Sequence, residues 1–189
     1  MKNKVLVIGA DHHNTLGIVE SLGQKGLNSY VLIVGENINS FVLKSRYVIE
    51  GWVCSSPEQV VDEMLKHFSD TKNKVIVYSS YDNISSVLDS SVQRLSPFFI
   101  LPVTNMPGSL ERKMSKEYMS DLAREVGLDV PRTWMVSDRE EPTDIEFPCI
   151  TKAISSVEGS KKNIKICKKR EELEEFLANS EHCPCLLYT

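Results

Sequence analysis

The sequence lacks the long apolar run that a membrane-spanning helix requires. No apolar stretch approaches the roughly 18 residues of such a span. A short apolar stretch near the N-terminus is interrupted by Asp11 and two histidines, and we interpret it as a strand rather than a signal peptide. We therefore expect a cytoplasmic protein with no membrane partner.

An excess of positive charge is also missing. The chain has 22 lysines and arginines against 26 aspartates and glutamates, which gives a net charge of −4 at pH 7. No global basic field favours nucleic acid as a partner. The 189 residues, 41% of them hydrophobic, are enough for one large domain or for one domain and part of another.

Cysteines and histidines are few, and their spacing does not indicate a metal centre. The five cysteines are scattered and odd in number, so reduced thiols are the simplest expectation. Cys183 and Cys185 form a C-x-C pair without a second pair, which is weak support for zinc or redox chemistry. His12 and His13 are adjacent, but neighbours in sequence rarely point at one ion. We assign no metal ligand and no catalytic residue.

The glycine fingerprint of dinucleotide-binding proteins is incomplete. Gly9 follows an apolar run and precedes a helix pattern, yet the second and third glycines of G-x-G-x-x-G are absent. Glu36 follows the second strand, where an acid would hold a ribose. One glycine and one acid are weak support for NAD or FAD, and a glycine that serves only the tight turn is the alternative.

The first half of the chain alternates between strand and helix patterns. Buried-strand patterns cover Val5–Ile8, Ser29–Val34, Lys74–Ser80 and Phe98–Pro102. Helix patterns run over about Thr15–Gln24, after Ser56, which is expected to cap its helix, and after Asp82. Strands separated by helices need crossover connections, which predicts a Rossmann-like α/β fold: a mostly parallel sheet with helices on both faces.

Three polar residues follow strands of this predicted sheet. Asp11 and His12 come after the first strand, and Asp82 comes after the third. Ligands of such folds bind at the carboxyl edge of the strands, so these residues are candidates for substrate binding. Solvated loop residues and, for Asp82, a plain helix cap are the alternatives.

After Pro102 the pattern becomes α+β. A turn-rich linker precedes a helix that ends at Gly127, and strand patterns at Phe147–Ala153 and Asn163–Lys168 favour an antiparallel pair. A glutamate-rich helix and a strand that reaches the last residue follow. Because that strand has no following turn and the last piece is too small to build its own core, we expect an N-terminal part of a longer protein.

Lys152 carries the main chemical signal. Alternation along its strand places Lys152 with Ile150 on one face, and a lysine at such a position needs an anion. The segment after it supplies hydroxyls, a glycine and a lysine that suit a phosphate cover: Ser156, Gly159, Ser160 and Lys161. An exposed hairpin with a solvated basic tip fits the composition equally well.

Taken in order, these motifs resemble the first subdomain of the ATP-grasp ligases. FPCITKA…SSVEGSKKNIKI…KREELEEFL is similar to that family's proline-bounded strand ending in lysine, phosphate-covering loop, second strand and glutamate-rich helix. MSKEYMSDLAREVGLDVPRTWMV resembles the helix and V-P-x-T strand that lead into it. The first half resembles the Rossmann-like domain before ATP-grasp in carbamoyl phosphate synthase and biotin carboxylase.

The resemblance implies a division of the chain into three parts. A pre-ATP-grasp Rossmann-like domain would occupy 1–107, a linking helix 108–130, and a truncated, small α+β first ATP-grasp subdomain 131–189. Lys152 and Lys116 match residues that bind the ATP phosphates, with Lys113 as a competing register for Lys116. The loop departs from the family pattern, because it has one glycine where two or three are common.

The implied activity is that of a carbamoyl phosphate synthase-like carboxylate–amine ligase. Such enzymes use ATP to convert a carboxylate to an acyl-phosphate, which an amine then attacks. In the family, carboxylates in the second subdomain bind Mg²⁺, so this chain alone is expected to be inactive. The alternative is a non-enzymatic, small-ligand-binding or regulatory Rossmann-like module. The substrates' identities stay open, and so does the oligomeric state, a homodimer included.

Overall fold

The computed structural model describes residues 3–103, 106–114, 116–136, 144–153, 164–178 and 185–189. The chain divides into two compact units, Met1–Arg112 and Lys113–Thr189, and each is described by itself. Among the described helices, none combines the length and the apolar character needed to cross a bilayer.

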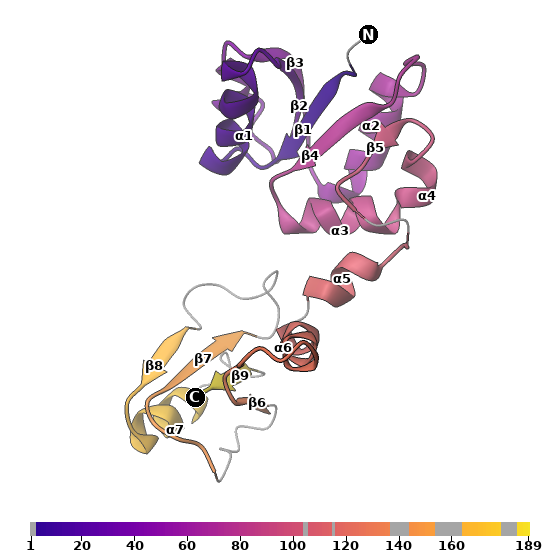
Figure 1. Cartoon of the computed structure of the whole chain (residues 1–189). Helices are drawn as coiled ribbons and strands as arrows, with labels where there is room; N and C mark the ends of the chain where they lie inside the picture. The colour runs from indigo at the N-terminus through magenta and orange to yellow at the C-terminus, as the bar shows by residue number, and fades with distance from the viewer. Residues whose placement is uncertain (1–2, 104–105, 115, 137–143, 154–163, 179–184) are drawn as a thin grey trace. The chain divides into compact units, whose positions relative to one another are not determined.

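The first unit contains a five-stranded parallel sheet with the order β3-β2-β1-β4-β5 (Figure 1). Its strands are β1 (Val5–Gly9), β2 (Ser29–Val34), β3 (Val48–Cys54), β4 (Val75–Ser79) and β5 (Phe99–Ile100). Unbroken apolar runs form β1 and most of β2 because both faces of a central parallel strand are covered. The predicted parallel sheet is confirmed.

Helices cover both faces of this sheet, also as predicted. The helix α1 (His13–Gln24) packs on one face against Val5, Val7 and Val31. The opposite face carries the larger core, in which Leu6 and Ile8 meet the helices that follow β3 and β4. The remaining helical elements of this unit are η1 (Val42–Lys44), η2 (Pro57–Gln59), α2 (Val60–Phe68), α3 (Asp82–Ser90) and α4 (Val92–Leu95), and the boundary between the units falls within α5 (Ser109–Met114).

The structure differs from the sequence predictions at two places in the first unit. The sequence did not predict the edge strand β3, whose apolar pattern is interrupted by exposed residues such as Glu50. Such residues are tolerated because β3 pairs with β2 on one side only. Ser56 makes no capping hydrogen bond; instead, Gln59 Oε1 accepts hydrogen bonds from the N–H and the hydroxyl of Ser55, each 3.1 Å long.

The second unit is built on a four-stranded antiparallel sheet with the order β6-β9-β7-β8 (Figure 1). Its elements are α6 (Lys116–Glu125), β6 (Thr133–Val136), β7 (Cys149–Ala153), β8 (Lys165–Cys167), α7 (Arg170–Ala178) and β9 (Cys185–Tyr188). The predicted antiparallel pair is β7 and β8. The boundary between the two units falls inside the stretch 108–130, where the linking helix was predicted.

One face of this second sheet carries a core of its own. Leu173, Phe176 and Leu177 of α7 pack against buried residues from all four strands, such as Val136 and Leu187. The expectation that the last piece is too small to build a core is therefore wrong. Alternation in short strands supplies enough inward-facing side chains for one amphipathic helix to cover.

Candidate functional site

The turn between β1 and α1 packs tightly against the end of β4. A Cβ atom on Gly9 would lie 2.0 Å from Ser80 Oγ and 2.3 Å from Thr15 Oγ1. Thr15 is buried, its hydroxyl donates to the Ala10 carbonyl at 2.7 Å, and it shares a 2.8 Å hydrogen bond with the Ser80 hydroxyl. Gly9 is thus needed for close packing, and protein hydroxyls fill the space beside it.

Asp11 connects two loops at the carboxyl edge of the sheet. Its Oδ1 accepts hydrogen bonds from the Ser40 hydroxyl at 2.5 Å and the Val42 N–H at 3.5 Å. Its Oδ2 accepts from the Asn37 amide at 3.3 Å. Asp11 occupies the position of the fingerprint's second glycine, so its carboxylate lies where the backbone would have to approach a pyrophosphate. This arrangement disfavours a dinucleotide at Gly9.

His12 forms the N-cap of α1. Its Nδ1 accepts a hydrogen bond from the Asn14 N–H at 3.2 Å, which satisfies one of the free donors of the first helical turn. The rings of His12 and His13 lie 3.7 Å apart, and both side chains are exposed. The first turn of α1 therefore presents two imidazoles to solvent.

Asp82 is the first residue of α3 and is exposed. The N-cap position belongs to Tyr81, so the interpretation of Asp82 as the capping residue is wrong. Hydrogen bonds of Ser79 connect the end of β4 to the start of α3. The Ser79 hydroxyl donates to the Tyr81 carbonyl at 3.1 Å and accepts from the Ser85 hydroxyl at 2.9 Å. The Asp82 carboxylate stands in the first turn, where the helix dipole favours a negative charge.

The strand order places these turns at a topological switch point. After β1 the chain passes to one face of the sheet with α1, and after β4 it passes to the other face with α3. A crevice at such a point is the usual ligand site of open α/β sheets. The sequence did not predict the Thr15–Ser80 contact that joins the two turns. Within the described residues, no hydrogen bond or ion pair joins Asp82 to Asp11 or His12.

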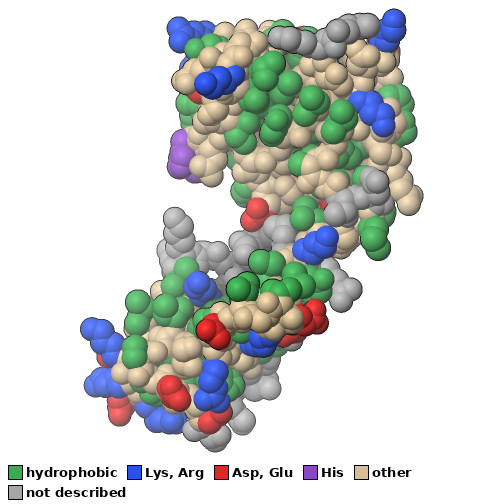
Figure 2. All heavy atoms as spheres, viewed as in Figure 1, with side chains coloured by type: hydrophobic (Ala, Val, Ile, Leu, Met, Phe, Trp, Pro, Cys, Tyr) green, Lys and Arg blue, Asp and Glu red, His purple; other side chains and the backbone are tan. Residues whose placement is uncertain are grey.

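A surface hollow of about 610 Å³ adjoins this edge, between α1 and the end of β4. Its lining mixes polar and apolar side chains from α1 with two residues at the end of β4: His13, Asn14, Ser21, Ile18 and Leu22, and Tyr78 and Ser80. Figure 2 shows hydrophobic side chains gathered on the visible face of the first unit. Such a mixed lining suits a small ligand with one polar end.

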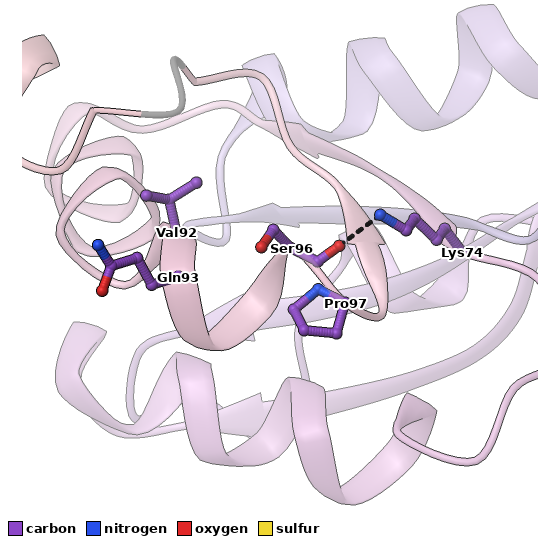
Figure 3. A pocket seen from close by; sticks show the side chains of 5 residues that line it. All are labelled: Lys74, Val92, Gln93, Ser96 and Pro97. Carbon is purple, nitrogen blue, oxygen red and sulfur yellow. Dashed lines mark hydrogen bonds between the residues drawn. The ribbon is translucent and has the colours of Figure 1, made fainter.

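A second hollow, of about 440 Å³, lies at the opposite end of the sheet (Figure 3). Lys74, which directly precedes β4, lines it together with residues from α4 and the turn after it. The Lys74 ammonium donates a 2.6 Å hydrogen bond to the Ser96 carbonyl, as Figure 3 shows. This hollow is at the amino end of the strands, so it is a weaker candidate than the carboxyl edge.

The second unit offers a different kind of site, on the sheet face opposite α7. Directly paired residues of antiparallel strands point to the same face. Lys152 of β7 and Met135 of β6 are both paired with Leu186 of β9, so they share the face that α7 does not cover. The alternation predicted for Lys152 is confirmed, because its neighbour Thr151 is fully buried on the core side.

The row next to Lys152 on this open face is apolar. Ile166, Ile150 and Tyr188 are paired across β8, β7 and β9. Ile166 is 58% exposed and Met135 is 52% exposed. Lys152 Nζ lies 5.5 Å from the centre of the Tyr188 ring, and burial raises the pKa of the Tyr188 phenol. The open face thus offers a cation beside apolar surface, which suits a ligand with anionic and apolar parts.

Several predicted site residues cannot be assigned a geometry. Ser156, Gly159, Ser160 and Lys161 lie outside the described residues. Lys116 is the first residue of α6, but its side chain is also outside them, whereas Lys113 of α5 is exposed. Within the described part of the chain, no group of three His, Cys, Asp or Glu side chains could hold a metal ion.

Comparison with known proteins identifies the fold. No family model matches the chain, and no curated protein matches its sequence. Among solved structures, an L-amino acid ligase from Bacillus licheniformis superimposes with a TM-score of 0.70 at 15% identity, over 100% of this chain and 44% of that one. An N5-carboxyaminoimidazole synthase from Aspergillus clavatus, in complex with ADP and 5-aminoimidazole ribonucleotide, gives 0.62 at 12% identity, over 98% and 46%.

A third similar structure is the biotin carboxylase domain of Hydrogenobacter thermophilus 2-oxoglutarate carboxylase. It was solved as a dimer with MgADP, ADP and bicarbonate, and it gives a TM-score of 0.62 at 14% identity, over 100% of this chain and 44% of that one. These proteins are ATP-grasp ligases, and the chain spans less than half of their length. The chain has the fold of the N-terminal portion of an ATP-grasp ligase.

Proposed function

We propose that this chain is the N-terminal portion of an ATP-dependent carboxylate–amine ligase, and that the open face of the second sheet holds part of the nucleotide. Lys152 carries the proposal, because its ammonium stands beside apolar side chains on a face that α7 does not cover. A lysine neutralises phosphate charge, and apolar side chains suit a base or a ribose. Two similar structures contain ADP, which supports this proposal.

In this proposal, bound ATP supplies a phosphoryl group to a substrate carboxylate, and an amine attacks the resulting acyl-phosphate. Lys152 holds the phosphate tail together with segment 156–161 and with Lys116, for which Lys113 is the alternative. The carboxylates that bind Mg²⁺ would belong to a part of the protein outside this chain. We therefore propose that the chain is inactive by itself.

The carboxyl edge of the first sheet is proposed as the co-substrate side. Asp11, His12 and Asp82 would contact the small carboxylate or amine there, next to the hollow beside α1. The proposal includes a cytoplasmic location, in keeping with the scattered cysteines of the sequence, which are odd in number. It also includes a homodimer as one possible assembly, since one similar structure is a dimer.

The test compares ATP binding by Lys152→Ala and Lys168→Ala in the complete protein that the proposal requires. Each variant removes one lysine from the β7–β8 hairpin, but Lys168 is exposed just after β8 and serves as the matched control. A hydrogen bond to a charged group contributes about 1.5–3 kcal/mol, so Lys152→Ala should weaken ATP binding roughly 10- to 100-fold. Isothermal titration calorimetry measures both affinities, and the control should match the wild type.

Equal ATP affinity in Lys152→Ala and the wild type would remove Lys152 from the site. Failure of the complete protein to bind any nucleotide would overturn the ligase proposal itself. In that case, a thermal shift of the first unit with small metabolites would favour the non-enzymatic ligand-binding module instead.

A further inference from the structure

Two cysteines face each other inside the second unit. Cys149 is the first residue of β7, Cys167 is the last residue of β8, and the two are direct partners in the antiparallel register. Both side chains point into the core under α7, where Cys149 is 1% exposed and Cys167 is fully buried. The Cys149 side chain is hydrogen-bonded to the Cys167 thiol.

This placement meets the geometric needs of a disulfide. Directly opposed residues of antiparallel strands have Cα atoms about 4.5 or 5.5 Å apart, depending on the type of pair. A disulfide needs Cα atoms roughly 4.4–6.8 Å apart and side chains directed at each other. The direct register and the thiol contact are compatible with both conditions.

The other described cysteines are not placed in this way. Cys185 is fully buried in the same core, but its register partners are Val136 and Ala153, neither of which is a thiol. Cys54 is buried in the first unit. Among the described cysteines, only Cys149 and Cys167 are direct register partners.

We infer that Cys149 and Cys167 form a redox-active dithiol that closes to a disulfide when a low-molecular-weight disulfide acts as the oxidant. The Cys167 thiolate attacks one sulfur of the oxidant and releases one thiol. The Cys149 thiolate then attacks Cys167 Sγ and releases the second thiol. Two protein thiols are oxidised and one oxidant disulfide is reduced to two thiols, so atoms and electrons balance.

Access to the pair depends on opening of the hairpin. Burial raises the pKa of the Cys167 thiol, so the reactive thiolate is scarce while β8 stays in place. However, β8 has three residues and lies at the edge of the sheet, with β7 as its only neighbouring strand. An edge strand of this length opens locally at low cost, so oxidation should proceed slowly through the opened state.

The crosslink would join the strands on either side of residues 154–163. The disulfide itself does not depend on the proposed function. Its formation is tested without nucleotide, so failure of one proposal leaves the other standing.

The experiment treats the 189-residue chain with oxidised glutathione, quenches with acid, alkylates the remaining thiols and maps the peptides by mass spectrometry. The wild type should lose two of its five thiols and yield a peptide that links Cys149 to Cys167. Sub-denaturing urea should accelerate the reaction, and the oxidised second unit should melt several degrees higher, because the crosslink restricts its unfolded state.

Three variants separate this pair from other thiols. Cys185→Ala removes an equally buried thiol from the same core and should form the same linked peptide as the wild type. Cys149→Ala and Cys167→Ala should form no intramolecular disulfide. Retention of all five thiols in sub-denaturing urea, or a linked peptide that joins Cys183 to Cys185 instead, would overturn the inference.

Discussion

The same substitution, glycine to alanine, should have opposite effects at two positions of the β1–α1 unit. At Gly9 a new Cβ would meet Ser80 Oγ at 2.0 Å and Thr15 Oγ1 at 2.3 Å, so one or both hydroxyls must move. At Gly17, inside α1, a new Cβ meets nothing within 4 Å. Neither glycine has a positive φ, so contact and helix propensity alone decide the outcome.

The magnitudes follow from these contacts. Displacing the Thr15 hydroxyl breaks its hydrogen bonds to Ala10 and Ser80, at roughly 0.5–1.5 kcal/mol each. The overpacking itself costs about 1–3 kcal/mol. We expect Gly9→Ala to lower the free energy of unfolding by about 2–6 kcal/mol. Gly17→Ala should raise it by about 0.5–1 kcal/mol, the preference of alanine over glycine within a helix.

Urea unfolding followed by the fluorescence of Trp52 measures both effects. Trp52 lies on β3 in the first unit, and a Trp134→Phe background removes the other tryptophan of the chain. If Gly9→Ala were as stable as Gly17→Ala, the reasoning from the Thr15 and Ser80 contacts would be refuted.

Three further predictions concern other contacts. His12 Nδ1 caps α1 by accepting a hydrogen bond from the Asn14 N–H, so His12→Ala should lower the free energy of unfolding by about 1 kcal/mol. His12→Asn should restore that stability, because asparagine also caps helices. Thermal melts measure both variants, and equal losses of stability would exclude the cap. Asp89 is buried and accepts a 2.8 Å hydrogen bond from the N–H of Leu110 in α5. Because Asp89→Ala removes this attachment of α5, a protease should cut the chain before α5 faster in the variant than in the wild type. An unchanged cleavage rate would contradict a stabilising role for this hydrogen bond. Burial raises the pKa of the Cys54 thiol above 9.0, so the thiol stabilises the fold fully below pH 9.0 and loses that contribution as pH rises through its folded pKa. In urea unfolding on either side of pH 9.0, the free energy of unfolding should decline less in Cys54→Ala than in the wild type. An identical decline in both proteins would contradict a role for the Cys54 thiol.

The central strands could be predicted because their signal is local. The runs that form β1, β2 and β4 are apolar almost without interruption, as strands covered on both faces must be. The alternation in β7 likewise separates Lys152 from its core-facing neighbours, because it needs only the residues of that one strand. By contrast, β3 has a mixed pattern, because an edge strand with one neighbour tolerates polar and exposed residues.

The candidate site was predicted only in part. The sequence predicted Lys152 as a site residue. Its surroundings on the open face depend on how β6, β8 and β9 pair with their neighbours, and no local pattern encodes that register. The Thr15–Ser80 hydrogen bond joins residues 65 positions apart, and the Asp11 contacts join loops that follow different strands. Contacts of this kind arise from packing between elements, so a single sequence carries no signal for them.

Three features could be predicted from the residues alone: the parallel sheet with helices on both faces, the α+β character of the second half and the face on which Lys152 lies. Hydrophobic periodicity decides these features, and it acts within one element at a time. The close packing that requires glycine at position 9, the side chains around Lys152 and the pairing of Cys149 with Cys167 became visible in the folded chain. These features depend on which strands become neighbours and in what register, and that choice is made when distant segments pack together.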